Sequence, residues 1–478
     1  MESRLSAEVL NTYPQVDERE LDSLLGQELA KSSVKIVVLD DDPTGVQTVH
    51  DISVYTDWSL ESIRRGFEED NKVFYILTNS RGMTVAETTA VHREIGANVA
   101  AAAKETGKPY LIMSRSDSTL RGHYPLEPKL LKESMERDGH RVDGEILCPF
   151  FKEGGRYTIG NVHYVKQGKE LVPAAETEFA KDKTFGYTHS SIPEYIEEKT
   201  KGEYKAANVS CISLEDLRSC NYDGITAHLM EVKDFNKVCV NAVDYCDIKV
   251  FVIALYRAMA KGKTFMFRTA AGLVKVMGGI SDRPLLTRRE MVVKETACGG
   301  IVVVGSHTQK TTAQLKELLK LEQVEAVEFN SDLILQGEEA FYKEVDRCVA
   351  REEAIIRSGK TAVCYTCRTL LEVENDTKES ALLRSMKISD GVQRLVGQLK
   401  ETPAFVVAKG GITSSEVGTK ALAVKRANVL GQIQPGIPVW QTGAESRFPL
   451  TPYVVFPGNV GDDETLRRAV EILTDTRS

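Results

Sequence analysis

The sequence predicts an α/β fold with two α/β domains, each built on a mainly parallel sheet, and we expect the active site in the cleft between them. Two observations carry this prediction. Short runs of β-branched and aromatic residues alternate with longer amphipathic stretches, which is the pattern of strand–helix–strand units. The chain has 478 residues, and a domain usually holds ~100–200 residues, so two large domains, or three small ones, are expected.

The first domain is predicted to span residues 1–285. Residues 17–31 and 84–106 are predicted helices, the second because charged residues face an Ala-rich apolar stripe. Residues 152–205 are rich in glycine and interrupt the alternation, so we expect loops or a β-hairpin there, placed as a lid. The predicted strands are Lys35–Asp40, Ile52–Asp57, Val73–Asn79, Tyr110–Ser114, Glu145–Phe151, Asn208–Ser213 and Lys237–Ala242.

The second domain is predicted to span residues 286–478. The segment Gly278–Val292, which contains Arg283-Pro284 and mixed charges, is the best linker candidate. No internal repeat and no low-complexity tract is visible. The predicted strands are Gly300–Gly305, Val324–Phe329, Thr361–Thr366, Ala404–Ala408 and Tyr453–Phe456.

Composition excludes several classes of protein. The formal net charge of −8 argues against nucleic-acid binding, which needs clustered Lys and Arg. The nine cysteines are an odd number, and several lie in apolar runs, which indicates reduced thiols. No apolar run approaches the ~20 residues that cross a bilayer, and no secretory signal is visible. We therefore expect a cytoplasmic protein without a membrane partner; a homodimer is one oligomeric state that the sequence leaves open.

Polar side chains follow the ends of three predicted strands in the first domain, where ligands bind in open parallel sheets. Three adjacent aspartates need a cation or a ligand's hydroxyl groups to offset their repulsion; a solvated acidic turn is the alternative. Arginine beside Ser and Thr suits a polyhydroxylated acid, although a helix N-terminus explains the same residues. The candidates are Asp40, Asp41, Asp42, Thr44, Gly45, Asn79, Arg81, Arg115, Ser116, Asp117, Ser118, Thr119 and Arg121.

Glycine-rich loops follow three predicted strands of the second domain. Because glycine has no Cβ, backbone N–H groups of such loops can approach a phosphate closely. Three loops favour a nucleotide site; tight strand-to-helix turns that need positive φ are the alternative. The candidates are Gly305, Ser306, Thr308, Lys409, Gly410, Gly411, Ile412, Thr413, Pro457, Gly458, Asn459 and Gly461.

Other familiar signatures are missing. Gly262-Lys263-Thr264 and Gly359-Lys360-Thr361 look like the end of a P-loop, but neither has the required first glycine. Cys364 and Cys367 form a lone CxxC without a second pair at zinc spacing. We therefore predict neither a Walker-type NTPase nor protein ligands for a metal.

Taken together and in their order along the chain, the polar segments of the first domain and the glycine-rich loops of the second resemble the motifs of the four-carbon acid sugar kinase family. The resemblance extends from about residue 34 to 475. The sequence differs from the family pattern at Val46, at 307–308 and at Ile412, and its 150–280 region looks longer than usual. The matching segments are 41–45 (Asp-Asp-Pro-Thr-Gly), 117–122 (Asp-Ser-Thr-Leu-Arg-Gly), 305–308 (Gly-Ser-His-Thr), 409–414 (Lys-Gly-Gly-Ile-Thr-Ser) and 457–461 (Pro-Gly-Asn-Val-Gly).

The resemblance implies an ATP-dependent kinase for a 3-oxo-tetronate, erythronate or threonate, with the sugar-acid domain first and the ATP domain second. Asp41 or Asp42 would orient or deprotonate the attacking hydroxyl, with Asp117 and Arg121 also catalytic, and Arg115 or Arg121 would hold the substrate carboxylate. Mg²⁺ would bridge phosphate oxygens with few protein ligands. Two other classes stay open: a sugar-acid dehydrogenase or aldolase, and a protein that binds sugar acid and nucleotide without turnover.

Overall fold

Buried β-branched runs form the central strands of the protein in this computed structural model, which describes residues 2–369, 371, 373, 376, 378–458 and 460–475. Every residue of Lys35–Asp40 and Val73–Leu77 is buried, as expected of parallel strands that helices cover on both faces. The chain forms two compact units. Unit 1 comprises Met1–Gly45 and Asp57–Asp282, and unit 2 comprises Val46–Thr56 and Arg283–Ser478.

Unit 1 is built on a parallel sheet in the order β10-β11-β6-β12-β5-β2-β4. Most of these strands match runs that the sequence predicts. The exception is β12, which lies in the middle of the sheet between β5 and β6. The strands are β2 (Lys35–Asp40), β4 (Val73–Leu77), β5 (Tyr110–Arg115), β6 (Gly144–Cys148), β10 (Ser210–Ile212), β11 (Asn236–Val240) and β12 (Phe265–Thr269).

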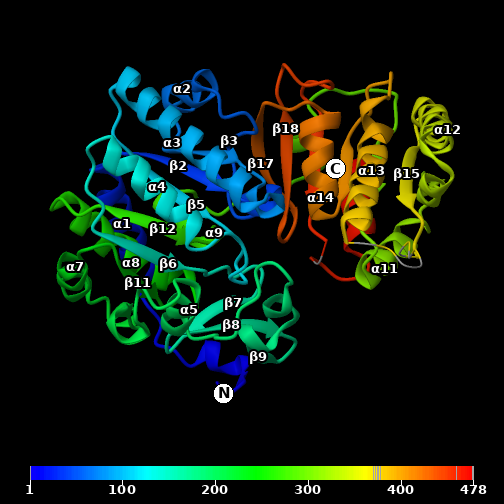
Figure 1. Ribbon diagram of the computed structural model, residues 1–478. Helices are drawn as coiled ribbons and strands as arrows, with labels where there is room; N and C mark the ends of the chain where they lie inside the picture. Colours follow the sequence, from blue (N-terminus) through cyan, green and yellow to red (C-terminus); the bar gives the residue numbers. More distant parts are fainter. Residues whose placement is uncertain are drawn as a thin grey trace. The chain divides into compact units, whose positions relative to one another are not determined.

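Helices cover both faces of this sheet (Figure 1). Helices α2, α3 and α4 pack side by side on one face, and α1, α7 and α9 pack around α8 on the other. The predicted helix 84–106 is confirmed as α3, which begins with a capping box between Thr84 and Glu87. The helices are α1 (Glu18–Ala30), α2 (Leu60–Glu68), α3 (Val85–Thr106), α4 (Leu126–Arg137), α5 (Ile192–Lys199), α6 (Leu214–Arg218), α7 (Tyr222–Glu231), α8 (Tyr245–Ala260) and α9 (Ala271–Met277).

A small antiparallel sheet occupies the glycine-rich region of unit 1, in the order β1-β9-β8-β7. The expected β-hairpin is confirmed by the pairing of β7 with β8. A backbone hydrogen bond from His163 to Ser190 ties β8 to the segment before α5. The strands are β1 (Leu5–Ser6), β7 (Arg156–Ile159), β8 (Val162–Gln167) and β9 (Glu170–Pro173).

Unit 2 is built on a mixed sheet in the order β3-β17-β18-β19-β16-β13-β15-β14. The strands β19, β16, β13, β15 and β14 are parallel, whereas β3, β17 and β18 pair antiparallel. The strands are β3 (Ile52–Tyr55), β13 (Ile301–Val304), β14 (Val324–Phe329), β15 (Thr361–Thr366), β16 (Val406–Lys409), β17 (Arg426–Gln434), β18 (Ile437–Thr442) and β19 (Pro452–Phe456).

The helices of unit 2 also form two groups (Figure 1): α12, α13 and α14 pack together, and α15 contacts α10 and α11. A core of buried aliphatic and aromatic side chains, Val302, Val407 and Phe456 among them, joins the sheet to α15. The helices are α10 (Arg288–Met291), α11 (Gln309–Leu318), α12 (Glu338–Arg357), α13 (Lys378–Gly397), α14 (Gly411–Glu416) and α15 (Thr465–Thr474).

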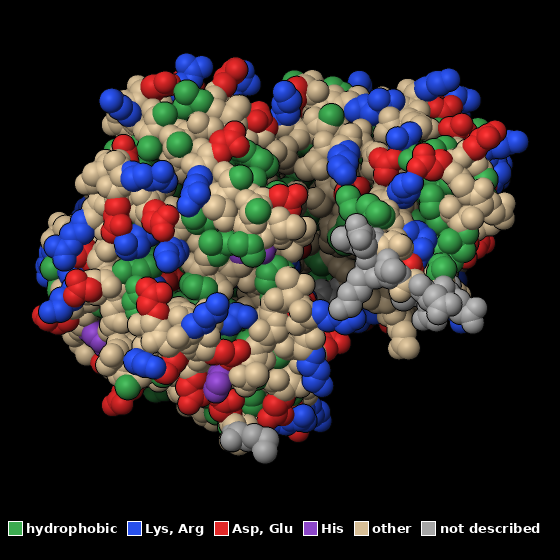
Figure 2. Space-filling view, viewed as in Figure 1, with side chains coloured by type: hydrophobic (Ala, Val, Ile, Leu, Met, Phe, Trp, Pro, Cys, Tyr) green, Lys and Arg blue, Asp and Glu red, His purple; other side chains and the backbone are tan. Residues whose placement is uncertain are grey.

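Three observations concern the charged surface, the cysteines and the lengths of the helices. Acidic and basic side chains are interspersed on the face shown in Figure 2, without a continuous basic stripe. All nine cysteines are free. In the part of the chain that the structure describes, none of the helices has the length and apolar character needed to span a bilayer.

Candidate functional site

The register of unit 1 brings the predicted site residues to one edge of its sheet. Asp40 is level with Leu77 of β4 and with Arg115 of β5, and Arg115 is level with Thr269 of β12. Four neighbouring parallel strands therefore end together. The polar segments that follow them share the position at which open α/β sheets bind ligands.

Arg81 links the second and third aspartates. Its Nε and Nη2 donate to the two carboxylate oxygens of Asp41 at 3.2 and 2.6 Å, and its Nη1 donates to Oδ2 of Asp42 at 3.2 Å. The other oxygen of Asp42 accepts hydrogen bonds from the backbone N–H and hydroxyl of Thr44. The short turn after β2 is thus fixed by its own side chains and by an arginine from the next strand end.

The first aspartate belongs to a deeper layer. Oδ1 of Asp40 accepts a hydrogen bond from Nη1 of Arg115 at 3.1 Å, and Ser116 Oγ donates to Asp41 Oδ2 at 2.5 Å. The side chains of Asp40, Asp41 and Arg115 are only 2–4% exposed, whereas those of Asp42 and Arg81 are 17% and 22% exposed. The buried layer supports the site, and the outer side chains can touch a ligand.

The loop after β5 contributes a second carboxylate. Asp117 accepts a 2.6 Å hydrogen bond from Arg121 Nε and another from the Thr119 hydroxyl. Arg121 also lies 3.7 Å from Asp182. The Asp117 side chain is 12% exposed and that of Arg121 is 23% exposed. The half-buried Asn79, in the left-handed backbone region (φ 56°), completes the predicted set in this unit.

Burial and charge separate the pKa values of these carboxyl groups. Burial raises the pKa of Asp40 to about 7, although Arg115 acts in the opposite direction. Burial also disfavours the ionised form of Asp41, but the positive charges of Arg81 and Arg115 outweigh the effect of burial, so the pKa of Asp41 is lowered. The pKa of Asp117 is held far below its usual range, because Arg81 and Arg121 outweigh its burial. Asp41 and Asp117 are therefore anions at neutral pH.

Sequence patterns did not indicate the support that β12 and α4 give to this site. Arg268 Nη1 donates to Glu127 at 2.7 Å, and its Nη2 donates to the Arg121 carbonyl at 3.0 Å. A Cβ on Gly122, whose φ is +114°, would lie 2.7 Å from Ser116 Oγ and 2.8 Å from Arg268 Nη2, so the close approach needs glycine. Arg268 follows the apolar run 265–267, which is the signal that could have revealed it.

Three successive carbonyl groups of the same loop are held by side chains from residues 163–195. His163 Nε2 donates to the Ser118 carbonyl at 2.7 Å, and Nδ1 lies 3.0 Å from the Thr158 hydroxyl. Burial lowers the pKa of His163 to about 4, so the ring is neutral and can make both contacts. The hydroxyls of Tyr187 and Tyr195 donate to the carbonyls of Thr119 and Leu120 at 2.7 and 2.8 Å. We call these three side chains the carbonyl clamp.

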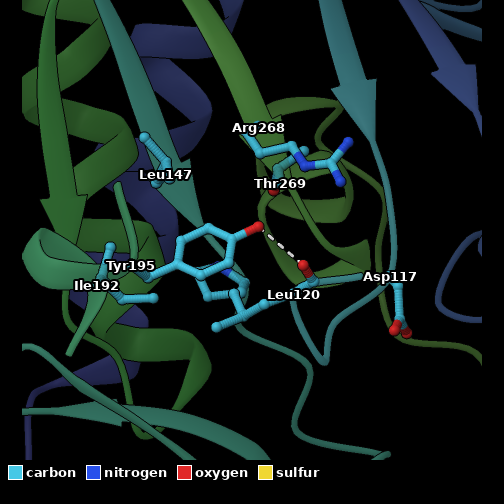
Figure 3. Close-up of a pocket in the computed structure, with 8 residues that line it drawn as sticks. Asp117, Leu120, Leu147, Ile192, Tyr195, Arg268 and Thr269 are labelled. Atoms are coloured by element: carbon cyan, nitrogen blue, oxygen red, sulfur yellow. Dashed lines mark hydrogen bonds between the residues drawn. The ribbon is translucent and has the colours of Figure 1, made fainter. Parts of the chain in front are cut away.

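A small pocket lies beside the carbonyl clamp, with mainly apolar walls (Figure 3). In Figure 3 the Tyr195 hydroxyl points at the Leu120 carbonyl, and the carboxylate of Asp117 points away from the Tyr195 ring. The lining residues are Asp117, Leu120, Leu147, Pro149, Ile192, Tyr195, Arg268 and Thr269. The pocket therefore lies against the loop that carries Asp117.

The three glycine loops of unit 2 also meet. Val304 of β13 is level with Lys409 of β16, which is level with Phe456 of β19. A Cβ on residue 305 would lie 2.3 Å from Oγ1 of Thr413, so the first loop can pack against the second only with glycine at this position. Thr308 caps α11 by accepting a hydrogen bond from the Thr311 N–H, and helix N-termini attract anions.

Two cations hold these loops. Lys409 is fully buried and donates to the carbonyls of Pro457 and Gly458 at 2.6 and 3.1 Å. Its bonds join the second loop to the third, and burial lowers its pKa to about 7. Arg368, which follows β15, donates to the Ser306 carbonyl at 2.5 Å, while its buried Nε and Nη1 have no hydrogen-bond partner among the described residues. Arg368 was not a candidate from the sequence.

The remaining candidates of unit 2 occupy the same loops. Ile412 is 72% exposed at the start of α14. The carbonyl of Gly461 accepts a 3.1 Å hydrogen bond from Lys310, which ties the third loop to α11. Asn459 lies outside the described residues.

Two family models match the chain. A sugar-binding N-terminal domain matches residues 36–277, and a nucleotide-binding C-terminal domain matches residues 301–466. The chain belongs to the four-carbon acid sugar kinase family. The first match covers most of unit 1, with its aspartate and arginine network, and the second lies within unit 2, with its glycine loops.

Solved structures show the same fold. A Salmonella typhimurium LT2 protein, provisionally described as a tRNA synthase, is 15% identical with a TM-score of 0.65, and the match covers 91% of this chain and 98% of that one. A DUF1537 protein from Haemophilus influenzae is 15% identical with a TM-score of 0.60, over 91% and 100% of the two chains. No curated protein matches the chain in sequence. At such identities the likeness concerns the fold alone.

Proposed function

We propose that this protein is an ATP-dependent kinase that phosphorylates a terminal hydroxyl of a small sugar acid of the four-carbon type. The observation that carries the proposal is the aligned strand edge of the sugar-binding domain. There the outer carboxylates Asp42 and Asp117 lie within one network with Arg81 and Arg121. Carboxylates accept hydrogen bonds from several hydroxyl groups, and guanidinium groups neutralise an anionic ligand.

Asp42 is the best candidate for the residue that orients or deprotonates the attacking hydroxyl. Its side chain is the most exposed of the three successive aspartates, and Thr44 and Arg81 fix its carboxylate. The low pKa of Asp117 suits a hydrogen-bond acceptor for substrate hydroxyls better than a base. Asp40 is too deeply buried to touch a ligand and would act by positioning Arg115.

The nucleotide-binding domain would bind ATP through its three loops. Backbone N–H groups of the loops that contain Gly305, Gly411 and Gly458 and the N-terminus of α11 would face the phosphates, whereas the N–H of Gly410 already donates to the Phe456 carbonyl. Nε and Nη1 of Arg368, which have no hydrogen-bond partner among the described residues, give a charged donor in the same place. Lys409 already binds two carbonyls, and we assign it to holding the loops in shape.

Phosphoryl transfer depends mainly on positioning and charge stabilisation. Mg²⁺ bound with ATP would neutralise charge on the phosphate oxygens. Within the described ranges, no group of three or more His, Cys, Asp or Glu side chains could hold a metal, so phosphate oxygens would supply most ligands. The protein would hold the acceptor hydroxyl in line with the terminal phosphate and keep water from that position.

The proposal is tested with Mg-ATP and a panel of erythronates, threonates and longer sugar acids, by following ADP release. At least one acid should stimulate ADP release well above background. Asp42→Asn should abolish this stimulation and retain ATP binding, whereas Asp223→Asn, at a fully exposed position of unit 1, should behave as wild type. Stimulation by none of the acids would refute the kinase. Loss of ATP binding in Asp42→Asn would reverse the roles of the two domains.

A further inference from the structure

The guanidinium groups around the strand edge of unit 1 are not equivalent. Four of the five arginines have a carboxylate partner, at 2.6–3.1 Å. In such a pair the carboxylate accepts hydrogen bonds from the guanidinium N–H groups and compensates its charge, so fewer N–H groups are left for a ligand. The four pairs are Arg81 with Asp41, Arg115 with Asp40, Arg121 with Asp117, and Arg268 with Glu127.

Arg156 is the fifth, and it differs from the others. Among the described residues, no carboxylate lies within ion-pairing distance of it, and its buried Nε has no hydrogen-bond partner. Its Nη1 donates to the nearby Gly154 carbonyl. Burial lowers the pKa of Arg156, while the charge of Asp117 partly raises it. A partly buried cation without a carboxylate partner among the described residues is costly, so this position is suited to an anion from outside the protein.

The backbone brings Arg156 to the same edge as the other site residues. Strand β6 ends at Cys148, and the chain then turns back on itself within a few residues. The backbone groups of Phe151 and Arg156 exchange two hydrogen bonds of 3.1 and 2.8 Å, which closes this turn. Arg156 therefore follows the carboxyl end of β6 and begins β7.

Phe179 connects Arg156 to the loop after β5. The guanidinium of Arg121 lies 5.1 Å from the centre of the Phe179 ring, and that of Arg156 lies 5.4 Å from it. The two cations therefore share one aromatic platform, which positions planar guanidinium groups. Arg121 is committed to carboxylates of the protein, because its Nε and its Nη1 face Asp117 and Asp182, whereas Arg156 has no such partner in the part of the chain that the structure describes.

We propose that Arg156 binds the carboxylate of the sugar acid and is the main determinant of specificity for an acid over a neutral polyol. This inference rests on the proposed function, since it assigns one subsite of the same ligand. Arg115 and Arg121, the candidates from the sequence, are occupied by Asp40 and Asp117. The hydroxyl groups of the substrate would then extend toward Asp117 and Asp42.

The test compares a tetronate with its uncharged amide. The wild type, Arg156→Met and Arg156→Lys are titrated with D-erythronate, L-threonate and the two corresponding amides, by calorimetry for Kd and by ADP release for KM and kcat. Arg93→Met removes an exposed arginine from α3 and serves as the control. Thermal unfolding establishes that each variant is folded.

Arg156→Met should raise Kd and KM for the acids by on the order of 10- to 100-fold, the effect of losing a charged hydrogen-bonding partner. It should leave Kd for the amides within about two-fold of wild type, because their carboxamide has no charge for Arg156 to pair with. The Kd and KM of Arg156→Lys for the acids should lie between those of the wild type and of Arg156→Met, since lysine keeps the charge and loses the planar guanidinium group. Arg93→Met should match the wild type.

The outcomes separate the inference from the proposed function. An unchanged ratio of acid to amide affinity in folded Arg156→Met would overturn the role of Arg156, even if the wild type is an active kinase. Arg156-dependent binding of an acid without ADP release would support the subsite and refute the kinase. Failure of the wild type to bind any of the four compounds would overturn both.

Discussion

Replacing Tyr187 and Tyr195 by phenylalanine removes two of the three donors of the carbonyl clamp. Their hydroxyls bond to the carbonyls of Thr119 and Leu120, which lie between the site residues Asp117 and Arg121. Leu120 has a φ of 69°, a left-handed conformation that is unfavourable for leucine by about 1 kcal/mol or more. The clamp therefore holds a strained backbone in the shape that presents both charged side chains.

The size of the effect follows from burial. A neutral hydrogen bond contributes about 1 kcal/mol, and a buried carbonyl that loses its donor costs about 1–3 kcal/mol. Both tyrosines are buried, Tyr195 almost completely. The double variant should therefore be about 2–6 kcal/mol less stable. If relaxation of Leu120 displaces Arg121 by about 1 Å, kcat/KM should fall on the order of 100-fold.

Urea unfolding and ADP release measure the two effects separately. Tyr256→Phe is the control, because its hydroxyl also donates to a buried carbonyl, that of Met277 at 3.0 Å. The control should lose stability and keep wild-type kcat/KM. The reasoning is refuted if the folded fraction of the double variant retains wild-type kcat/KM, measured at substrate concentrations well below KM, since the clamp would then only stabilise the fold.

Three other predictions concern single positions. Gly45→Ala places a Cβ 1.8 Å from Asp40 Oδ2, so it should lower stability by about 1–3 kcal/mol and impair turnover. Gly26→Ala in α1 is the control, because its Cβ would have no atom within 4 Å. Measured by urea unfolding, this control should be slightly more stable than the wild type. Burial raises the pKa of Glu352 from 4.5 to about 8, so between these pH values the folded protein keeps a proton that the unfolded chain has lost. The free energy of unfolding should therefore fall by up to roughly 1.4 kcal/mol per pH unit as the pH rises through this range. Glu352→Gln should remove this slope, and a variant whose stability falls with pH as steeply as that of the wild type would contradict the prediction. Arg368→Met should weaken binding of a fluorescent ATP analogue about 10-fold or more without changing sugar-acid affinity; unchanged nucleotide affinity would exclude Arg368 from the site.

Most of the strand edge could be predicted from the sequence, because the signal is local. The apolar run of β2 is followed directly by Asp40, and the run of β5 directly by its polar loop. Parallel strands in one sheet end at one edge, so the two segments had to meet. The same reasoning located the three glycine loops of unit 2.

The supporting residues could not be predicted in this way. Strand β12 is only five residues long and follows the long apolar helix α8, so no change of period marks it, and Arg268 was missed. Arg156 and the carbonyl clamp come from the glycine-rich region, where the hairpin was expected but its contacts were not. Such contacts depend on how β7 to α5 pack against the loop after β5, which local patterns do not specify. The predicted strand Ile52–Asp57, placed among those of the first domain, is β3 (Ile52–Tyr55) and pairs with β17 in unit 2, because a local pattern does not specify which sheet a strand joins.

The most direct test of the central claim is the identity of the product. ATP labelled in its terminal phosphate is incubated with Mg²⁺ and the tetronate that best stimulates ADP release, and the sugar acid is recovered and analysed by mass spectrometry and ³¹P NMR. We predict a phosphorylated tetronate that carries the label on its terminal hydroxyl, and none with Asp42→Asn. Release of labelled inorganic phosphate with an unmodified sugar acid would contradict the account.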